Sequence, residues 1–122
     1  MPATRLKACP ASPNCVSSLS DKVASYIEPV PAEGDPQRLM RNLMKQLGTM
    51  PGMEIVTQEV DYIHVLFRSK LFKFIDDVEF EFVVEENVLH MRSASRTGYY
   101  DFGVNRRRLE QIRQTLVKTS LT

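Results

Sequence analysis

The sequence predicts an α+β fold, with a single layer of about four antiparallel strands and two helices on one face. Apolar residues repeat every three or four positions after residue 35 and again after residue 105, as in amphipathic helices. Between these segments, residues 53–93 alternate with a period of two, as in strands. A chain of 122 residues can bury a core as a single domain, so we expect one domain over residues 1–122.

Residues 1–34 hold most of the prolines and show no sustained period. Such composition predicts an extended Pro-rich N-terminal arm that is ordered only where it lies on the rest of the domain. We therefore divide the chain into this arm and residues 35–122, which contain a helix, four strands and a second helix.

The first helix has clear start and stop signals. Asp35 is a suitable N-cap, and Pro36 follows at the first helical position, where no backbone N–H is needed. Gly48 is a suitable C-cap. The apolar stripe between them consists of Leu39, Met40, Leu43, Met44 and Leu47.

We expect four strands, at residues 53–59, 61–69, 78–85 and 88–93. A two-residue loop at Glu86-Asn87 would place Glu81 opposite Arg92 and Val84 on the buried face, whereas a longer loop would shift this register. The remaining members of that buried face would be Val78, Phe80 and Phe82, with Ile63, Val65 and Phe67 from the preceding strand.

Two histidines, His64 and His90, would share the outer face of the sheet. We interpret them as surface residues and expect no metal site, because no third ligand accompanies them. The segment SKLFKFIDD at residues 69–77 is interpreted as a wide hairpin end whose aromatic side chains fold into the core. The alternative is that this segment forms an apolar lip at the mouth of a pocket, or a tip that touches a membrane.

Residues 92–108, RSASRTGYYDFGVNRRR, form the most unusual stretch. We expect Asn105 to be the N-cap of the last helix, so Arg106, Arg107 and Arg108 would fall in the first turn. The positive end of the helix dipole repels cations there. Negative partners are therefore expected, either Asp76, Asp77 and Asp101 or an anionic ligand.

Three segments resemble domain-of-unknown-function family 1499, a family of bacterial and plant proteins. They are SPNCVSS at residues 12–18, FIDDVEF at residues 74–80 and RSASRTGYYDFGVNRRRLEQIR at residues 92–113. The resemblance implies no assigned reaction. It implies these signature residues: Pro13, Asn14, Cys15, Asp76, Asp77, Arg92, Ser95, Arg96, Gly98, Asp101, Gly103, Asn105 and Arg106. Tyr100 departs from the family pattern, which tends to have serine there.

Whether Cys9 and Cys15 are free thiols or form a disulfide depends on the cellular compartment of the protein. The first residues lack the apolar core of a signal peptide, so we expect a cytoplasmic protein with two free thiols. If a leader has been removed, the protein is exported and a disulfide is the first expectation. We find no segment of about 20 apolar residues that could span a membrane.

Our main functional hypothesis is a small binding or interaction module for an anionic group, a phosphate or a carboxylate, near a helix N-terminus. Its partner is unknown, and no cofactor is expected. The ligand-binding residues would be Arg92, Ser95, Arg96, Asn105 and Arg106, supported by Asp76, Asp77, Asp101, Gly98, Gly103 and Cys15.

Three alternatives remain open. The arginines and aspartates could simply pair and hold the arm and last helix to the sheet. A small enzyme could use Cys15 as nucleophile or Asp76 and Asp77 as acid and base, but adjacent residues of a strand point to opposite faces. Nucleic-acid binding is not favoured, because the formal net charge is only +1.

Overall fold

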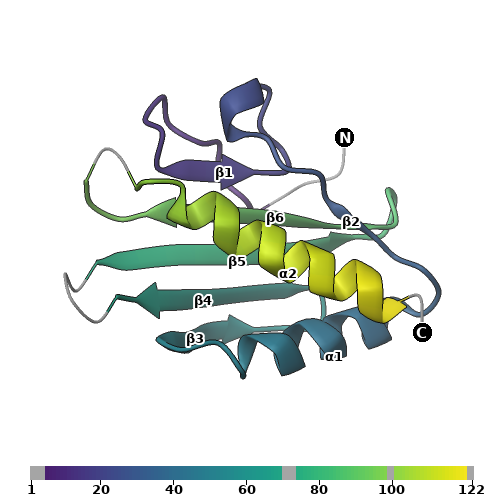
Figure 1. The fold of residues 1–122 in the computed structure, drawn as a ribbon. Helices are drawn as coiled ribbons and strands as arrows, with labels where there is room; N and C mark the ends of the chain where they lie inside the picture. Colours follow the sequence, from purple (N-terminus) through teal and green to yellow (C-terminus); the bar gives the residue numbers. More distant parts are fainter. Residues whose placement is uncertain (1–4, 70–73, 99–100, 121–122) are drawn as a thin grey trace.

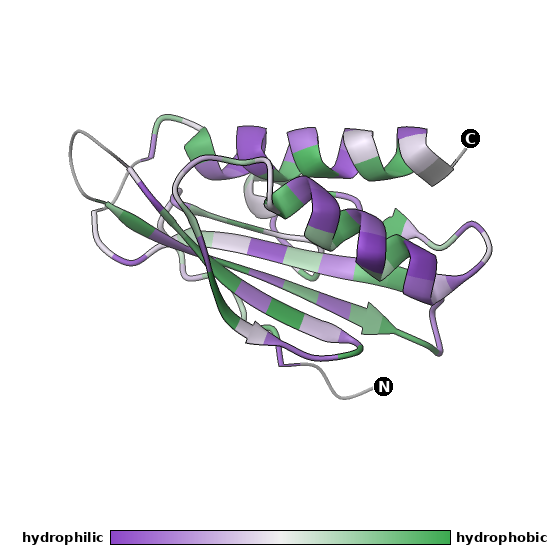
Figure 2. Cartoon of the chain, turned by 90° about the horizontal axis from the view of Figure 1, so that it is seen from below, coloured by the Kyte–Doolittle hydropathy of each residue, from purple (hydrophilic) through white to green (hydrophobic). Residues whose placement is uncertain are grey.

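In the computed structural model, which describes residues 5–69, 74–98 and 101–120, an antiparallel sheet is covered on one face by both helices (Figures 1 and 2). The strand order is β1-β6-β5-β4-β3, and β2 also pairs with β6. The elements are β1 (Cys15–Ser17), the 3-10 helix η1 (Val23–Ser25), β2 (Val30–Pro31), α1 (Pro36–Leu47), β3 (Met53–Gln58), β4 (Tyr62–Arg68), β5 (Ile75–Val83), β6 (Val88–Ser95) and α2 (Val104–Ser120). The α+β prediction is confirmed.

The sheet is larger than the four strands expected, because the N-terminal arm supplies β1 and β2. Both pair antiparallel with β6, whose backbone N–H and C=O groups would otherwise form an open edge. Val16 and Val30 are buried in the core. The arm is therefore part of the sheet, although its strands are too short to produce a repeat in the sequence.

Helix α1 begins as its sequence predicts. The Asp35 side chain accepts a hydrogen bond from the backbone N–H of Gln37 at 3.0 Å, and Pro36 opens the helix. Gly48 follows as C-cap. The buried side chains of the helix are Leu39, Met40, Leu43 and Leu47.

The core lies between the helices and one face of the sheet. Phe80 and Met91 are fully buried neighbours on β5 and β6, and Ile112 of α2 is also fully buried. The other core residues of the central strands and α2 are Ile63, Val65, Phe67, Val78, Phe82, Leu89, Leu109 and Leu116. The inward faces predicted for β4 and β5 are therefore confirmed except at Val84.

The register of the β5–β6 hairpin differs from the prediction. Val83 pairs with Val88, so the loop contains four residues rather than two. Asn87 adopts a positive φ of 57° in this loop, which Asn tolerates better than most residues. Val84 lies in the loop with 73% of its surface exposed, and its expected burial is wrong.

The shift moves the pairing by two residues, so each side chain keeps its expected face. Glu79, not Glu81, now stands opposite Arg92. Glu81 stands opposite His90. A shift by one residue would have exchanged the two faces of the strand.

Part of the outer face is also buried, which the sequence did not predict. His90 is buried, where its Nδ1 contacts the hydroxyl of Ser18 at 2.8 Å and its Nε2 contacts Glu86 at 3.0 Å. Leu66 of β4 and Leu6 of the arm are buried as well. His90 is therefore not a surface residue, because the arm covers this end of the sheet.

The apolar segment before β5 is only partly described. Leu71 and Phe72 lie outside the described residues. Phe74 is half-exposed, and the strand begins at Ile75. Within the described part of the chain, no helix is long and apolar enough to cross a membrane.

The observed hairpin register predicts different effects for two neighbouring truncations. Phe82→Ala should lower the free energy of unfolding by about 3–5 kcal/mol, because it empties a buried site. Val84→Ala should change it by less than about 0.5 kcal/mol, because Val84 is exposed. Urea unfolding measures both values, and a large cost at Val84 would support the two-residue loop instead.

Candidate functional site

The sheet divides the residues expected to form one arginine-rich site. Asp76 pairs with Ser95 on the face that carries the helices. Asp77 pairs with Ala94 on the opposite, outer face, because successive residues of a strand alternate. Of the five expected ligand-binding residues, Ser95, Asn105 and Arg106 belong to the helix side, whereas Arg92 and Arg96 interact on the outer face. The five therefore do not converge on one ligand.

Asn105 lies at the centre of a buried polar cluster on the helix side. Its Nδ2 donates to Ser95 Oγ at 3.0 Å and to the backbone carbonyl of Asn14 at 3.3 Å. Its Oδ1 accepts from the hydroxyl of Ser93 and from Arg108 Nη1. Since Asn105 is fully buried, these bonds replace the water that its amide loses on folding. Asn105 thus joins the arm, β6 and α2.

Asp101 replaces Asn105 as the residue that caps α2. Its carboxylate accepts from the backbone N–H of Gly103 at 2.9 Å and of Asn105 at 3.1 Å. Burial disfavours the charged form of Asp101, but the hydrogen bonds from Asn105 and Gly103 outweigh it and lower the pKa. The helix starts at Val104, one residue before the expected N-cap. The N-cap prediction for Asn105 is therefore wrong.

Arg106 and Arg107 have partners within the chain. Arg106 Nη2 donates to the backbone carbonyls of Ala24 at 3.0 Å and Tyr26 at 2.9 Å, which ties α2 to the arm. Arg107 Nη1 donates to the carbonyl of Phe102 at 2.8 Å. Carbonyl oxygens thus offset the repulsion between these cations and the helix dipole.

Among the three arginines at the start of α2, Arg108 is held by a buried ion pair and a ring contact. Its Nη2 lies 2.9 Å from the Asp76 carboxylate, with side-chain exposures of 12% and 10%. Its guanidinium also lies over the ring of Phe67, 4.6 Å from the centroid. These contacts support the architectural interpretation for the helix-start arginines.

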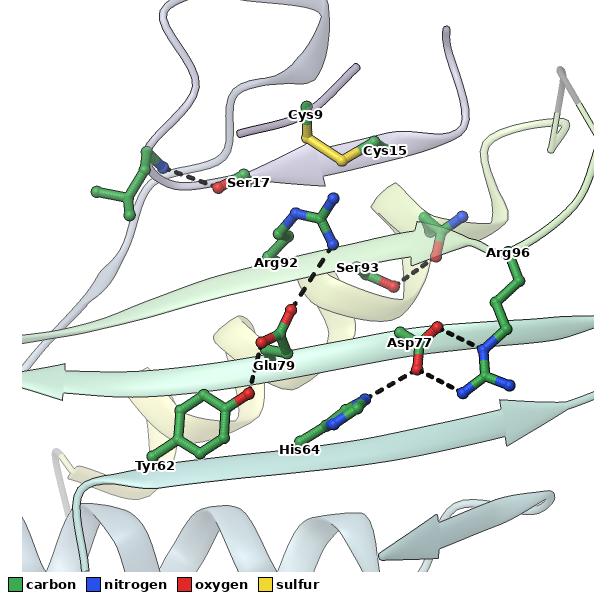
Figure 3. Close-up of polar contacts among 12 residues, drawn as sticks. Cys9, Cys15, Ser17, Tyr62, His64, Asp77, Glu79, Arg92, Ser93 and Arg96 are labelled. Carbon is green, nitrogen blue, oxygen red and sulfur yellow. Dashed lines mark hydrogen bonds and ion pairs between the residues drawn. A yellow bond between two sulfur atoms is a disulfide. The ribbon is translucent and has the colours of Figure 1, made fainter. Parts of the chain in front are cut away.

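Asp77 lies at the centre of a hydrogen-bonded group on the outer face (Figure 3). Arg96 binds its carboxylate with two nitrogens, at 2.8 and 3.1 Å, and His64 Nε2 lies 2.8 Å from it. Burial disfavours the charged form of Asp77, but these hydrogen bonds outweigh it and lower the pKa.

Arg92 lies next to this group and is less well paired. Its Nη1 is 3.7 Å from Glu79, too far for a hydrogen bond, while Glu79 accepts a short bond from the Tyr62 hydroxyl (Figure 3). Burial and Glu79 together raise the pKa of Tyr62. The Nε of Arg92 is buried without a hydrogen-bond partner in the described chain. Leaving such a donor unpaired is costly, so a partner is expected.

A hollow of ≈ 350 Å³ opens beside Arg92. Lys7 of the N-terminal arm adds a second cation to its lining. No repeat or motif marks Lys7 in the sequence, since only the path of the arm brings it to the hollow. The full lining is Lys7, His64, Asp77, Glu79, Arg92, Ala94 and Ser95.

A disulfide joins Cys9 and Cys15. Cys9 follows Lys7 by two residues, and Figure 3 shows the disulfide on the β1 side of Arg92. The expectation of two free thiols is therefore wrong. Cys15 is buried as well as oxidised, so it offers no thiolate for nucleophilic attack. The other form of the enzyme hypothesis, with Asp76 and Asp77 as acid and base, also lacks support, because these two residues lie on opposite faces of the sheet.

The remaining signature residues have local roles. Asn14 is buried, and its amide donates to the carbonyl of Gly98 at 2.6 Å. Gly98 and Gly103 both have positive φ values, of 84° and 78°, which favour glycine. Among the described residues, no group of three or more His, Cys, Asp or Glu could hold a metal ion.

Comparison with protein families identifies the family of this chain. The family described as "Protein of unknown function (DUF1499)" matches residues 5–116, nearly the whole chain. No curated protein matches the sequence. The three resemblance segments all lie within the matched range.

The pairing of Asp77 predicts a pH-dependent effect of Asp77→Asn. The variant should be less stable than the wild type at pH 7, where the carboxylate is charged and bound by Arg96. Folding lowers the pKa below its ordinary 3.8, so this stabilisation is present above pH 3.8 and disappears as the pH falls through the folded-state pKa.

Urea unfolding from pH 7 downward checks this expectation. The free energies of wild type and Asp77→Asn should converge at the acid end. Asp21→Asn, at an exposed aspartate, should follow the wild type throughout. A difference between wild type and Asp77→Asn that is independent of pH would contradict the ion-pair assignment.

Proposed function

The chain belongs to the DUF1499 family, whose description names no reaction, and we propose that it is a small module that binds an anionic group against Arg92. The group would be a phosphate or carboxylate of a small ligand or a partner protein. It would occupy the hollow on the outer face of the sheet, away from the helices.

The observation that carries this proposal is the unpartnered Nε of Arg92. The other four arginines of residues 92–108 donate hydrogen bonds within the chain. Only 12% of the Arg92 side chain is exposed, and its ion pair with Glu79 is long. An oxyanion in the hollow would supply the missing acceptor once the side chains that cover Nε move aside, and an arginine fork suits such an anion.

The charges around the hollow also favour an anion. Lys7 lines it beside Arg92, and Arg96 largely neutralises Asp77 through its two hydrogen bonds. The Tyr62 hydroxyl occupies one oxygen of Glu79. An incoming anion therefore meets two cations, while the nearest carboxylates are already engaged.

Binding of pyrophosphate and of citrate, measured by isothermal titration calorimetry at low salt, tests the proposal. Arg92→Gln should weaken binding of at least one of them by roughly tenfold or more, because a hydrogen bond to a charged group contributes about 1.5–3 kcal/mol. The matched control is Arg41→Gln, since Arg41 is exposed on α1.

Circular dichroism should show that both variants remain folded. Loss of binding in Arg92→Gln alone would support the site. Absence of binding of both anions to the wild type, or equal weakening in the two variants, would contradict it.

A further inference from the structure

We propose a second binding site on the helix-covered face, a pocket that takes a small planar apolar molecule carrying one hydrogen-bond donor. The pocket has a volume of ≈ 390 Å³ and lies where β4, β5 and the start of α2 meet. This size is in the range of small-molecule sites. The anion site lies on the other face of the sheet, and Ser95, at the end of β6, belongs to the lining of both.

The walls of the pocket are mainly apolar. Phe67 belongs to the core, whereas Phe74 lies just before β5, and Phe102 and Val104 lie at the start of α2. Aromatic side chains on several sides favour a flat ring system, which can stack on a ring face or meet a ring edge. Although several lining residues are polar or charged, most of the exposed lining surface is apolar, as in the usual composition of ligand pockets.

Phe102 lines the pocket and is largely exposed to solvent. Its side chain is 76% exposed, and its φ is +56°, a conformation that large side chains rarely adopt. The hydrogen bond from Gly103 to Asp101 holds this turn in place. An exposed aromatic ring held beside an apolar pocket would gain stability by covering a ligand.

The charged groups of the pocket exclude an anion. Arg108 is engaged by Asp76, Ser93 and Asn105, and its guanidinium lies over Phe67. Binding an anion there would require breaking these buried contacts. The remaining charged residues of the lining are Arg68 and Asp101, of opposite sign.

Asp76 provides the polar anchor. Its side chain is 10% exposed, and its Oδ2 faces Arg108. Asp76 lines the pocket, so a ligand can donate a further hydrogen bond to its second carboxylate oxygen. A ligand amine or hydroxyl can supply that donor, whereas a purely apolar ligand would leave the oxygen desolvated.

Fluorescence titration of the full chain with 1-aminoanthracene, a planar amine, tests the pocket. Phe102→Ala should weaken binding roughly tenfold, as expected for loss of aromatic surface from a ligand contact. Val23→Ala removes an apolar side chain that is 93% exposed and outside the pocket, and it should leave the affinity unchanged.

Competition with two naphthalenes tests the hydrogen bond. 1-Aminonaphthalene should displace the probe at a concentration roughly tenfold lower than 1-methylnaphthalene does. Equal displacement by both compounds would overturn the assignment of Asp76 as anchor.

Three outcomes of the titration would show that the probe does not bind in this pocket. Lack of saturable binding, or the same affinity for Phe102→Ala and wild type, would overturn the pocket. Displacement of the probe by pyrophosphate would also overturn it, because the probe would then occupy the hollow at Arg92. Failure of the anion site leaves these results unaffected.

Discussion

The buried amide of Asn105 is the interaction on which the rest of the structure depends. A fully buried amide must have its donors and acceptor paired, and its partners come from different parts of the chain. Asn14 belongs to the arm, Ser95 to β6 and Arg108 to α2. One side chain therefore fixes three elements relative to each other, and the ion pair from Arg108 to Asp76 extends this connection to β5.

This arrangement separates two kinds of arginine. Arg106 and Arg108 hold α2 against the arm and the sheet, so their charges are used within the fold. Arg92 points to the outer face, where Glu79 is too distant for a hydrogen bond. The sheet thus separates a structural face from a face that retains an unpaired donor. The proposed anion site follows from this difference.

The sequence predicted the elements whose signals are local. The α1 boundaries follow from Asp35 and Gly48, and the inward faces follow from alternation along the strands. Strands β1 and β2 were missed because two or three residues produce no period, and their stability comes from pairing with β6. For the candidate site, the sequence indicated which residues take part. It did not indicate which of them lie together, because that depends on the face of the sheet that each side chain occupies. The state of Cys9 and Cys15 depends on the compartment as well as on their separation.

A double-mutant cycle between Arg108 and Asp76 tests whether the arginines at the start of α2 stabilise the fold. The single variants Arg108→Met and Asp76→Ala and their combination would be compared with the wild type by urea unfolding. We expect a coupling energy of about 1–3 kcal/mol, because each single variant leaves the other charge buried and without its ion-pair partner. A coupling energy near zero would contradict this expectation, since Arg108 would then be free to serve a ligand instead of the sheet.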